Sequence, residues 1–589
     1  MVVFAVWLAP GLGVWVAPGL GAGALSAQVL NETMVPRGRI RVQAHAVFDA
    51  WDSRFGRSAD GSESIEALGD DLTDPTSLSL FPGMPTLQNI VRDVTGDGGF
   101  SPVVGSTDGR ITQDITRANW GIDVGVFDWL TVGAMLPWIR PRTALDVFFV
   151  PDSLNGNLGL NPTITAPASV TTFLGSTLAA DAAAQANATT ICAGGLTPAC
   201  ATAQALSQRA REFNASVQGA YGATPFFPLS SSTAGMALDQ AAATLSADLV
   251  AAGLSGLSAM ALATDLLSTE GFPLLPAVAG SGIQAAALES RPGIWAAGDI
   301  EVSARVRLLD NITPRWTATR TGETGLSGVG SGAARSGAES GTVGDVGTGS
   351  GNPGTPDGER SASTEEFIEP RAGAVLPSGG GIGYRVTASF KARLPTGTAE
   401  HPDILLDIGT GQGQTDFEGG MIATLLFGRR FGLTAGGRYG IQTSTSLIKR
   451  VAPLDLAMPP VSTRTDVIWT PGFYVTLEVA PTFHLSDALV LAGEYRFFHK
   501  GRDEFELVSP NPALDPTVLS IESGMKMHQI GGGLRYDTVT PWMLGEAPHP
   551  LELHLRLLTT IAGSGGHTPQ STRIEAGLRV FQRIWGPRR

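Results

Sequence analysis

Charge and cysteine are both scarce in this chain of 589 residues. Only 16% of the residues are Asp, Glu, Lys or Arg, and no basic domain stands out against the formal net charge of −14. Nucleic acid is therefore excluded as a partner, because such proteins carry a basic patch or stripe. The two cysteines, Cys192 and Cys200, lie in one loop-like segment, and we expect them to form a disulfide outside a reducing cytosol.

The chain also lacks the long apolar runs of membrane helices and the motifs of common enzymes. The most Ala-rich stretch, 237–267, contains three aspartates, which are costly at the centre of a bilayer. No G-x-S-x-G or H-E-x-x-H motif occurs, nor any Cys/His spacing of a zinc site. Residues 93–104 open like a calcium loop but end in Val104, where a carboxylate is needed, so we interpret them as a turn. We predict no catalytic activity, no cofactor and no bound metal.

What the chain has in abundance is strict alternation of apolar and polar residues. From Tyr384 to Leu394 every even position is apolar, and every odd position is polar or charged. Successive strand side chains point to opposite faces, so this segment has one apolar and one cationic face. A soluble sandwich would turn the charge to water, whereas an outer-membrane barrel turns the apolar face to lipid and the charge to its lumen. A mean hydropathy of +0.11 without a spanning helix favours the barrel.

Segments of this kind recur along the chain and predict about 12 strands. They are 39–51, 118–126, 130–138, 299–309, 384–394, 417–427, 431–441, 473–483, 489–497, 527–536, 551–557 and 573–580. An even count puts both termini on the same side of the membrane, as a single-chain barrel requires. We therefore predict an all-β fold, an antiparallel transmembrane β-barrel in the outer membrane of a Gram-negative cell.

The strand pattern is preceded by an apolar leader and interrupted twice. Residues 1–27 are predicted to be a signal peptide, although they lack a basic residue, and a buried apolar segment is the alternative. After the first barrel strands (38–140) comes an Ala-rich insertion, 141–292, whose parts 178–220 and 237–267 are predicted to be helical. Strand parity makes it extracellular, where it would cap the mouth or fold inward as a plug.

A second insertion follows the strand at 298–309. Residues 310–380 are rich in Gly and Ser and have too few apolar residues to offset the entropy of ordering, so we predict that they are disordered. The remaining barrel strands occupy 382–585.

If the alternation holds, charged side chains of both signs face the lumen. They are Arg39, Arg41, His45, Asp49, Arg117, Asp123, Glu301, Arg305, Arg307, Arg385, Lys391, Arg393, Glu418, Arg438, Glu478, Glu494, Arg496, Arg535, Glu552, Arg556, Glu575 and Arg579. Buried charges persist only when they are paired or hydrated. The lining is therefore either a ladder that selects permeants or a set of structural ion pairs that fills a closed lumen.

The pattern also predicts positions for several histidines and tryptophans. We interpret His45, His484 and His554, on separate strands, as polar lining of the lumen. Five tryptophans fall at strand ends or in turns, where aromatic girdles meet the lipid headgroups; core packing is the alternative. They are Trp129, Trp138, Trp469, Trp542 and Trp585.

Short Gly- and Pro-containing motifs resemble a known family. They are Gly298-Asp299-Ile300-Glu301-Val302 at the start of a strand, Leu394-Pro395-Thr396-Gly397 at the end of the next, Asp407-Ile408-Gly409-Thr410-Gly411, and the turn Gly125-Val126-Phe127-Asp128-Trp129-Leu130 followed by Leu136-Pro137-Trp138. These motifs resemble the outer-membrane proteins assigned to the meta-pathway of phenol degradation. The resemblance covers 39–51, 115–140 and 300 to the C-terminus, and it implies a β-barrel transporter for small, often aromatic or hydrophobic compounds.

The function predicted from the sequence is passive uptake of small, aromatic or hydrophobic molecules through an outer-membrane channel. Its partners are membrane lipid and a small-molecule permeant. The alternative is a structural or adhesive barrel with a closed lumen that displays the loop 141–292. A hypothesis specific to the channel is that the Ala-rich insertion gates the external mouth, so that deleting residues 171–267 would raise the conductance.

Overall fold

The computed structural model describes most of the chain. The described ranges are 34–57, 63–76, 79–81, 83–312, 382–428, 430–453, 456–521, 523–543, 546–565 and 568–585. The predicted signal peptide, 1–27, and nearly all of the predicted disordered insertion, 310–380, lie outside the described residues.

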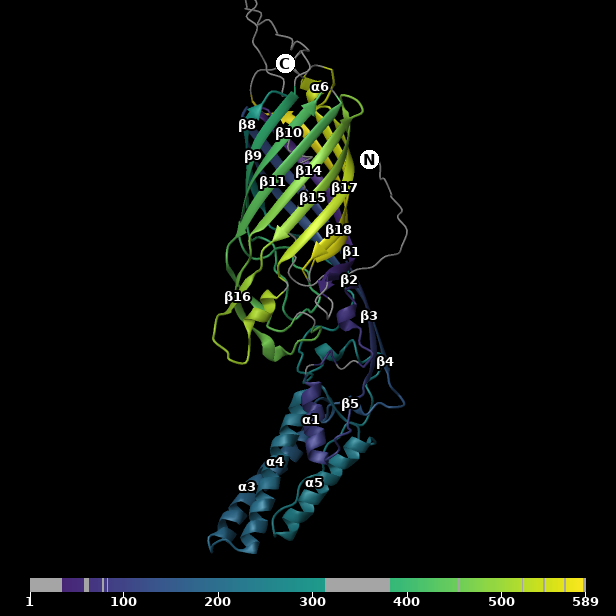
Figure 1. Cartoon of the computed structure of the whole chain (residues 1–589), viewed down its shortest axis with the longest axis vertical. Coiled ribbons are helices and arrows are strands. Elements are labelled where there is room, and N and C mark those ends of the chain that lie inside the picture. Colours follow the sequence, from purple (N-terminus) through teal and green to yellow (C-terminus); the bar gives the residue numbers. More distant parts are fainter. Residues whose placement is uncertain are drawn as a thin grey trace, which may run out of the picture.

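A closed antiparallel barrel forms the body of the molecule (Figure 1). Within the described ranges, twelve strands follow one another around it in chain order, and the last strand pairs with the first. The strands are β1 (Arg39–Arg57), β3 (Gly105–Phe127), β4 (Leu130–Pro151), β8 (Glu301–Asp310), β9 (Ile382–Arg393), β10 (Asp416–Phe427), β11 (Phe431–Gln442), β14 (Tyr474–His484), β15 (Leu489–Lys500), β17 (Met525–Asp537), β18 (Leu551–Ser564) and β19 (Thr568–Arg583). The predicted fold class and strand number are confirmed.

Alternation along each strand separates an apolar exterior from a charged interior. On β9, Phe390 is 59% exposed on the outer face, whereas the next residue, Lys391, is only 8% exposed. Large apolar side chains exposed on the outside include Val42, Phe48, Trp120, Ile122, Phe417, Leu477, Leu491, Leu553, Leu555 and Leu578. An outward apolar face on a closed barrel, which has no free edges, is the arrangement that a bilayer requires. The protein is a Gram-negative outer-membrane β-barrel.

The two ends of the barrel differ in the length of their connections. The end where β1 begins and β19 finishes, here called the terminal end, has the short turns at 128–129 and 485–488 and the small helix α6 (Val539–Met543). It also receives the connection 311–381 between β8 and β9, nearly all of which lies outside the described residues. The opposite end, here called the arm end, has the long connections 152–300, 443–473 and 501–524. Figure 1 shows α3, α4 and α5 extending away from this arm end.

Strands β3 and β4 continue far beyond the rest of the barrel. Their pairing runs from the turn at 128–129 out to Gly105 opposite Pro151, so β4 does not end near Pro141 as the sequence suggested. The prolines at 137 and 141 look like strand breakers, but both fall in gaps of the pairing on the side of β4 that faces away from β3. The ladder with β8 ends at Met135, β7 pairs only at Trp138 and Ile139, and the next bridge is at Thr143, so a residue without an N–H is tolerated between them. On the extension the inner face becomes apolar, and Ile111 and Phe149 are buried against the helices.

Helices make up about half of the Ala-rich insertion, with bounds that differ from those expected. They are α2 (Pro162–Thr165), α3 (Pro167–Cys192), α4 (Pro198–Ala223) and α5 (Thr233–Ala251), and α1 (Met84–Thr95) packs beside them. A disulfide joins Cys192 to Cys200 across the turn between α3 and α4. The expectation of helix up to residue 267 was wrong, because Gly253 takes a positive φ of 76° just after α5 and ends it. No helix among the described residues is both long and apolar enough to cross a membrane.

Small sheets complete the arm end. Strands β12 (Thr445–Arg450), β13 (Arg464–Thr470) and β16 (Glu504–Leu507) form a three-stranded sheet over the barrel mouth, here called the mouth sheet. Strands β5 (Leu158–Leu160) and β6 (Phe226–Pro228) pair beside the helices. Finally, β2 (Glu63–Ala67) pairs antiparallel with the last residues of β1, and β7 (Ala296–Ala297) pairs with β4. The large apolar core of the protein lies at the arm end, outside the barrel, around Phe173, Phe226 and Phe272.

Candidate functional site

The charged residues predicted to face the lumen all lie on barrel strands with their side chains turned from the outer surface. Those that are buried are Arg41, His45, Asp49, Arg117, Asp123, Glu301, Arg305, Lys391, Arg393, Glu418, Arg438, Glu478, Glu494, Arg496, Glu552, Arg556, Glu575 and Arg579. Arg39, Arg307, Arg385 and Arg535, which lie nearer the terminal end, are partly buried. Because neighbouring strands keep opposite charges at facing positions, these side chains meet in pairs.

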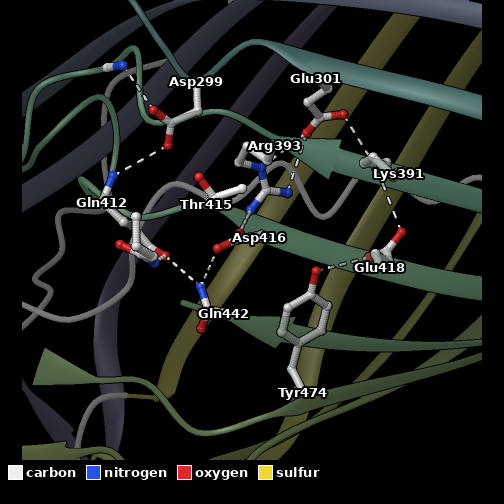
Figure 2. Close-up of polar contacts among 12 residues, drawn as sticks. Asp299, Glu301, Lys391, Arg393, Gln412, Thr415, Asp416, Glu418, Gln442 and Tyr474 are labelled. Carbon is white, nitrogen blue, oxygen red and sulfur yellow. Dashed lines mark hydrogen bonds and ion pairs between the residues drawn. The ribbon is translucent and has the colours of Figure 1, made fainter. Parts of the chain in front are cut away.

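On one side of the lumen, acids and bases alternate from strand to strand (Figure 2). Glu301 on β8 contacts both Lys391 and Arg393 on β9, each at 3.3 Å. Arg393 also binds the Asp416 carboxylate at 2.5 Å, and Lys391 lies 3.7 Å from Glu418 on β10. Every one of these carboxylates therefore lies within ion-pair distance of a cation, as buried charge requires.

The same alternation continues around the opposite wall. From Glu418 it passes to Arg438 at 3.8 Å, then to Glu478 at 2.6 Å, and then to Arg496 at 2.9 Å. Arg496 lies 3.9 Å from Glu494, which accepts a hydrogen bond from Arg556 Nη2 on β18 at 2.8 Å and also lies 2.8 Å from Arg556 Nε. Arg556 in turn lies 3.5 Å from Glu575 on β19. We call this chain of ion pairs, from Asp416 to Glu575, the charged belt.

A third cluster links β1, β3 and β8. Asp123 on β3 accepts hydrogen bonds from Arg41 on β1 at 2.6 Å and from Arg305 on β8 at 3.1 Å. Gly133, on the neighbouring strand β4, makes this possible: a Cβ at that position would lie 1.8 Å from an Asp123 carboxylate oxygen. Part of the high glycine content thus leaves room inside the barrel for long charged side chains.

Charged side chains are densely packed inside the barrel. Arg496 of the belt, and Arg41 and Glu552 on neighbouring strands, have no exposed surface at all, although they lie on the inner face. A wide water-filled bore would leave such side chains accessible. Both interpretations of the lining, a selective ladder and structural ion pairs in a closed lumen, stay predictions.

An apolar cavity of about 240 Å³ lies at the arm end, between the barrel mouth and the mouth sheet. It is enclosed by the connections 399–412 and 450–459 and by strands of the mouth sheet. The apolar residues that line it include Leu288, Ile404, Leu405, Leu406, Leu447, Leu456, Trp469, Phe505, Leu519 and Met525. Polar and charged residues line it as well, among them Arg54, Asp71, Glu400, His401, Asp407, Lys449, Arg450 and Asp503. A concave, largely apolar wall with a few polar groups is typical of binding sites for small ligands.

A small cluster of buried apolar residues lies between the cavity and the charged belt. Met525, which lines the cavity, belongs to one buried cluster with Met527, Phe498 and Tyr474 inside the barrel. The Tyr474 hydroxyl donates a hydrogen bond to Glu418 at 3.2 Å, so the cluster ends on the belt (Figure 2). A molecule that entered the lumen from the cavity would meet this cluster before the charged belt.

Asp299 fixes the loops at the rim of this region. It lies just before β8, and its carboxylate accepts hydrogen bonds from the backbone N–H groups of Gly397 and Gln412 (Figure 2). Burial raises the pKa of Asp299, while these donors and Arg393 act in the opposite direction. The carboxylate therefore holds two segments of the cavity wall together and is a structural part of the site.

Sequence reasoning missed several members of the site. Asp416 and Arg573 have the same strand phase as predicted lumen residues, so the alternation itself could have found them; Arg573 pairs with Asp49. The residues of the cavity lie in connections without periodicity, where no such signal exists. The girdle prediction was wrong for Trp469, which is 7% exposed and lies in the cavity wall, because β13 is not a barrel strand.

The other predicted tryptophans and histidines have varied positions. Trp129, Trp138 and Trp585 are exposed on the outside, whereas the Trp542 ring lies 4.3 Å from the Arg39 guanidinium. His484 is partly buried at the end of β14. The other two histidines, His45 and His554, lie together on the lumen wall with their ring centroids 5.1 Å apart.

Several solved outer-membrane barrels are similar to the chain, but no protein-family model and no curated protein matches it. The COG4313 outer membrane channel from Pseudomonas putida F1 has 6% sequence identity, and the match covers 94% of this chain and 98% of that chain with a TM-score of 0.37. The Ralstonia pickettii toluene transporter TbuX has 7% identity, with coverage of 97% and 95% and a TM-score of 0.27.

The translocator domain of the autotransporter NalP from Neisseria meningitidis is also similar to this chain. It has 8% identity, with coverage of 95% of this chain and 92% of that chain and a TM-score of 0.26. At such TM-scores no argument about this chain rests on the likeness. The resemblance to the proteins of phenol degradation therefore stays a prediction, and the assignment to the outer membrane rests on the closed barrel and its apolar exterior.

Proposed function

We propose that this protein is an outer-membrane channel for passive uptake of small, hydrophobic or aromatic molecules, which bind first in the cavity at the arm end. The observation that supports this most directly is the apolar lining of that cavity. In this proposal the arm end is extracellular, because long connections are typical of the outer side of such barrels and short turns of the periplasmic side. The barrel performs no covalent chemistry of its own.

The order of apolar and charged surfaces suits a hydrophobic permeant. Burial of apolar surface contributes about 25 cal/mol per Å², so the cavity would concentrate such a molecule from water. The cluster of Met525, Met527, Phe498 and Tyr474 then offers a second apolar surface inside the lumen. Passage beyond it requires the ion pairs of the charged belt to separate for a time, so transport is gated by the permeant.

Uptake by the full-length protein in liposomes tests the proposal. We expect phenol and ethylbenzene to enter faster than in protein-free liposomes, and glucose to enter at the protein-free rate, because the belt leaves no continuous water path. Single-channel conductance in planar bilayers should be low for the same reason. Equal uptake of glucose and aromatics would contradict the proposal, as would no uptake of either.

The packed lumen favours a second function, that of a structural or adhesive barrel that presents its helices to the outside. Arg41, Arg496 and Glu552 lack exposed surface, as a permanently closed lumen requires. Failure of every permeant in the liposome experiment, together with binding of cells to a surface through α3–α5, would support this function instead.

The position of the helices argues against the hypothesis that the Ala-rich insertion gates the channel. Because α3 and α4 extend away from the barrel (Figure 1), whereas 399–412 and 450–459 enclose the cavity at its mouth, we expect the helices not to gate. Replacing the helical tip, residues 181–208, by a short Gly-Ser linker should leave the conductance in planar bilayers unchanged. A marked rise in conductance would restore the original hypothesis that the Ala-rich insertion closes the mouth.

A further inference from the structure

Two imidazoles and a carboxylate meet on the lumen wall where the first and last strands of the barrel pair. His45 lies on β1, His554 on β18 and Glu575 on β19, and these three strands are neighbours in the order β18–β19–β1. One potential ligand atom from each residue lies within 4.8 Å of the other two. In the part of the chain that the structure describes, no other group of His, Cys, Asp and Glu has this spacing.

The separations are close to those of ligands that share one metal ion. His554 Nε2 lies 3.2 Å from Glu575 Oε1, and His45 Nδ1 lies 3.8 Å from the same oxygen. Two ligands that each lie about 2.0–2.1 Å from a tetrahedral zinc ion are roughly 3.4 Å apart. Only small movements of the side chains would therefore be needed to complete the coordination.

A glycine shapes the site. Gly577 on β19 faces His45 on one side and His554 on the other in the strand register. A Cβ at this position would lie 2.0 Å from His554 Cε1, so any other residue would displace the ring. Because Gly577 leaves this space free, both imidazoles lean towards β19, with their planes at 80° to each other.

The two nitrogens of each ring have different surroundings. His45 Nε2 and His554 Nδ1, the nitrogens further from Glu575, have no hydrogen-bond partner in the described structure, although the two side chains are only 7% and 6% exposed. When a neutral ring carries its proton on that nitrogen, His45 Nδ1 and His554 Nε2 are left bare beside Glu575 Oε1, as metal ligands must be. Arg556 contacts the other oxygen of Glu575, at 3.5 Å, which leaves Oε1 to the histidines.

We propose that His45, His554 and Glu575 bind a divalent transition-metal cation that links β18, β19 and β1. Two imidazoles and one carboxylate suit zinc and the neighbouring first-row metals, and they leave a coordination position open towards the lumen. Because the ion ties the first strand to the last two, it stabilises the closed barrel. The site is independent of the proposed transport.

Zinc titration of the full-length barrel in detergent micelles, after treatment with a chelator, tests this site. We expect one tightly bound zinc ion per chain and a rise of several degrees in the midpoint of thermal unfolding. H45Q and H554Q should each weaken zinc binding at least tenfold. H484Q is the matched control, because His484 is also a histidine on a barrel strand but lies outside the cluster, and it should bind zinc as the wild type does.

The absence of stoichiometric zinc from the wild-type protein would overturn the proposal. So would unchanged binding by the H45Q H554Q double variant, or an equal loss in H484Q. Heat-dependent migration on SDS gels reports whether each variant folds. If the cluster variants fail to fold, X-ray absorption by zinc bound to the wild type decides: two imidazole ligands support the site, and any other ligand set excludes it.

Discussion

Replacing Glu478 by glutamine is expected to lower the free energy of unfolding of the barrel by about 3–5 kcal/mol, the range for breaking a buried ion pair by removing one partner. Glu478 lies 2.6 Å from Arg438 and 2.9 Å from Arg496. Glutamine keeps the volume but not the charge, so both guanidinium groups lose their closest anion. Urea-induced unfolding of the protein in detergent micelles measures the change.

Two variants separate this effect from a general loss of stability. E504Q removes a carboxylate that is exposed on β16, and it should change the free energy of unfolding by less than about 0.5 kcal/mol. In the E478Q R496Q double variant one unpaired cation is gone, so part of the lost stability should return. If E478Q is as stable as E504Q, the charged belt does not depend on pairing, and our account of the closed lumen is wrong.

Placing a carboxylate in the cavity by L447D should weaken the binding of naphthalene to the protein at least tenfold. Leu447 lines the cavity, and an aspartate there would keep water beside the apolar ligand. A tenfold change in affinity corresponds to about 1.4 kcal/mol, which is less than the contribution of one well-buried apolar side chain. Equilibrium dialysis of radiolabelled naphthalene against the protein in lipid nanodiscs measures the affinity.

The neighbouring residue on β12 provides the control. Ile448 is 42% exposed and points away from the cavity, so I448D adds the same charge to the same strand without entering the proposed binding site. It should bind naphthalene like the wild type. Equal losses in L447D and I448D would mean that charge on the mouth sheet, rather than the apolar cavity, controls binding.

The barrel could be predicted from the sequence because its determinants are local. Along a segment such as 384–394, a period of two fixes which side chains face lipid, and the number of such segments gives the number of strands. The extension of β3 and β4 was missed because prolines near residue 141 mark the end of most strands but are tolerated where the pairing on one side of a strand is interrupted.

The contacts within the candidate site could not be predicted from the alternation. The alternation predicts that Glu478 and Arg496 point inward. It does not give the strand register, which pairs these two residues and brings His45 beside His554. These contacts depend on how twelve strands align around the barrel. The cavity was missed for another reason: the connections that enclose it have no periodicity, and only the tertiary fold brings Leu447 and Phe505 to one surface.

The pairing of β1 with β19 also constrains how the molecule is made. Asp49 accepts a hydrogen bond from Arg573, which lies 524 residues further along the chain. Strand β1 therefore cannot pair with β19 until nearly all of the polypeptide has been synthesised. Contacts so distant in sequence form slowly, because a long loop must close before they contribute. Until then β1 has an open edge that could pair with other chains. A chain that stops before Thr568 would keep that edge and be prone to aggregate.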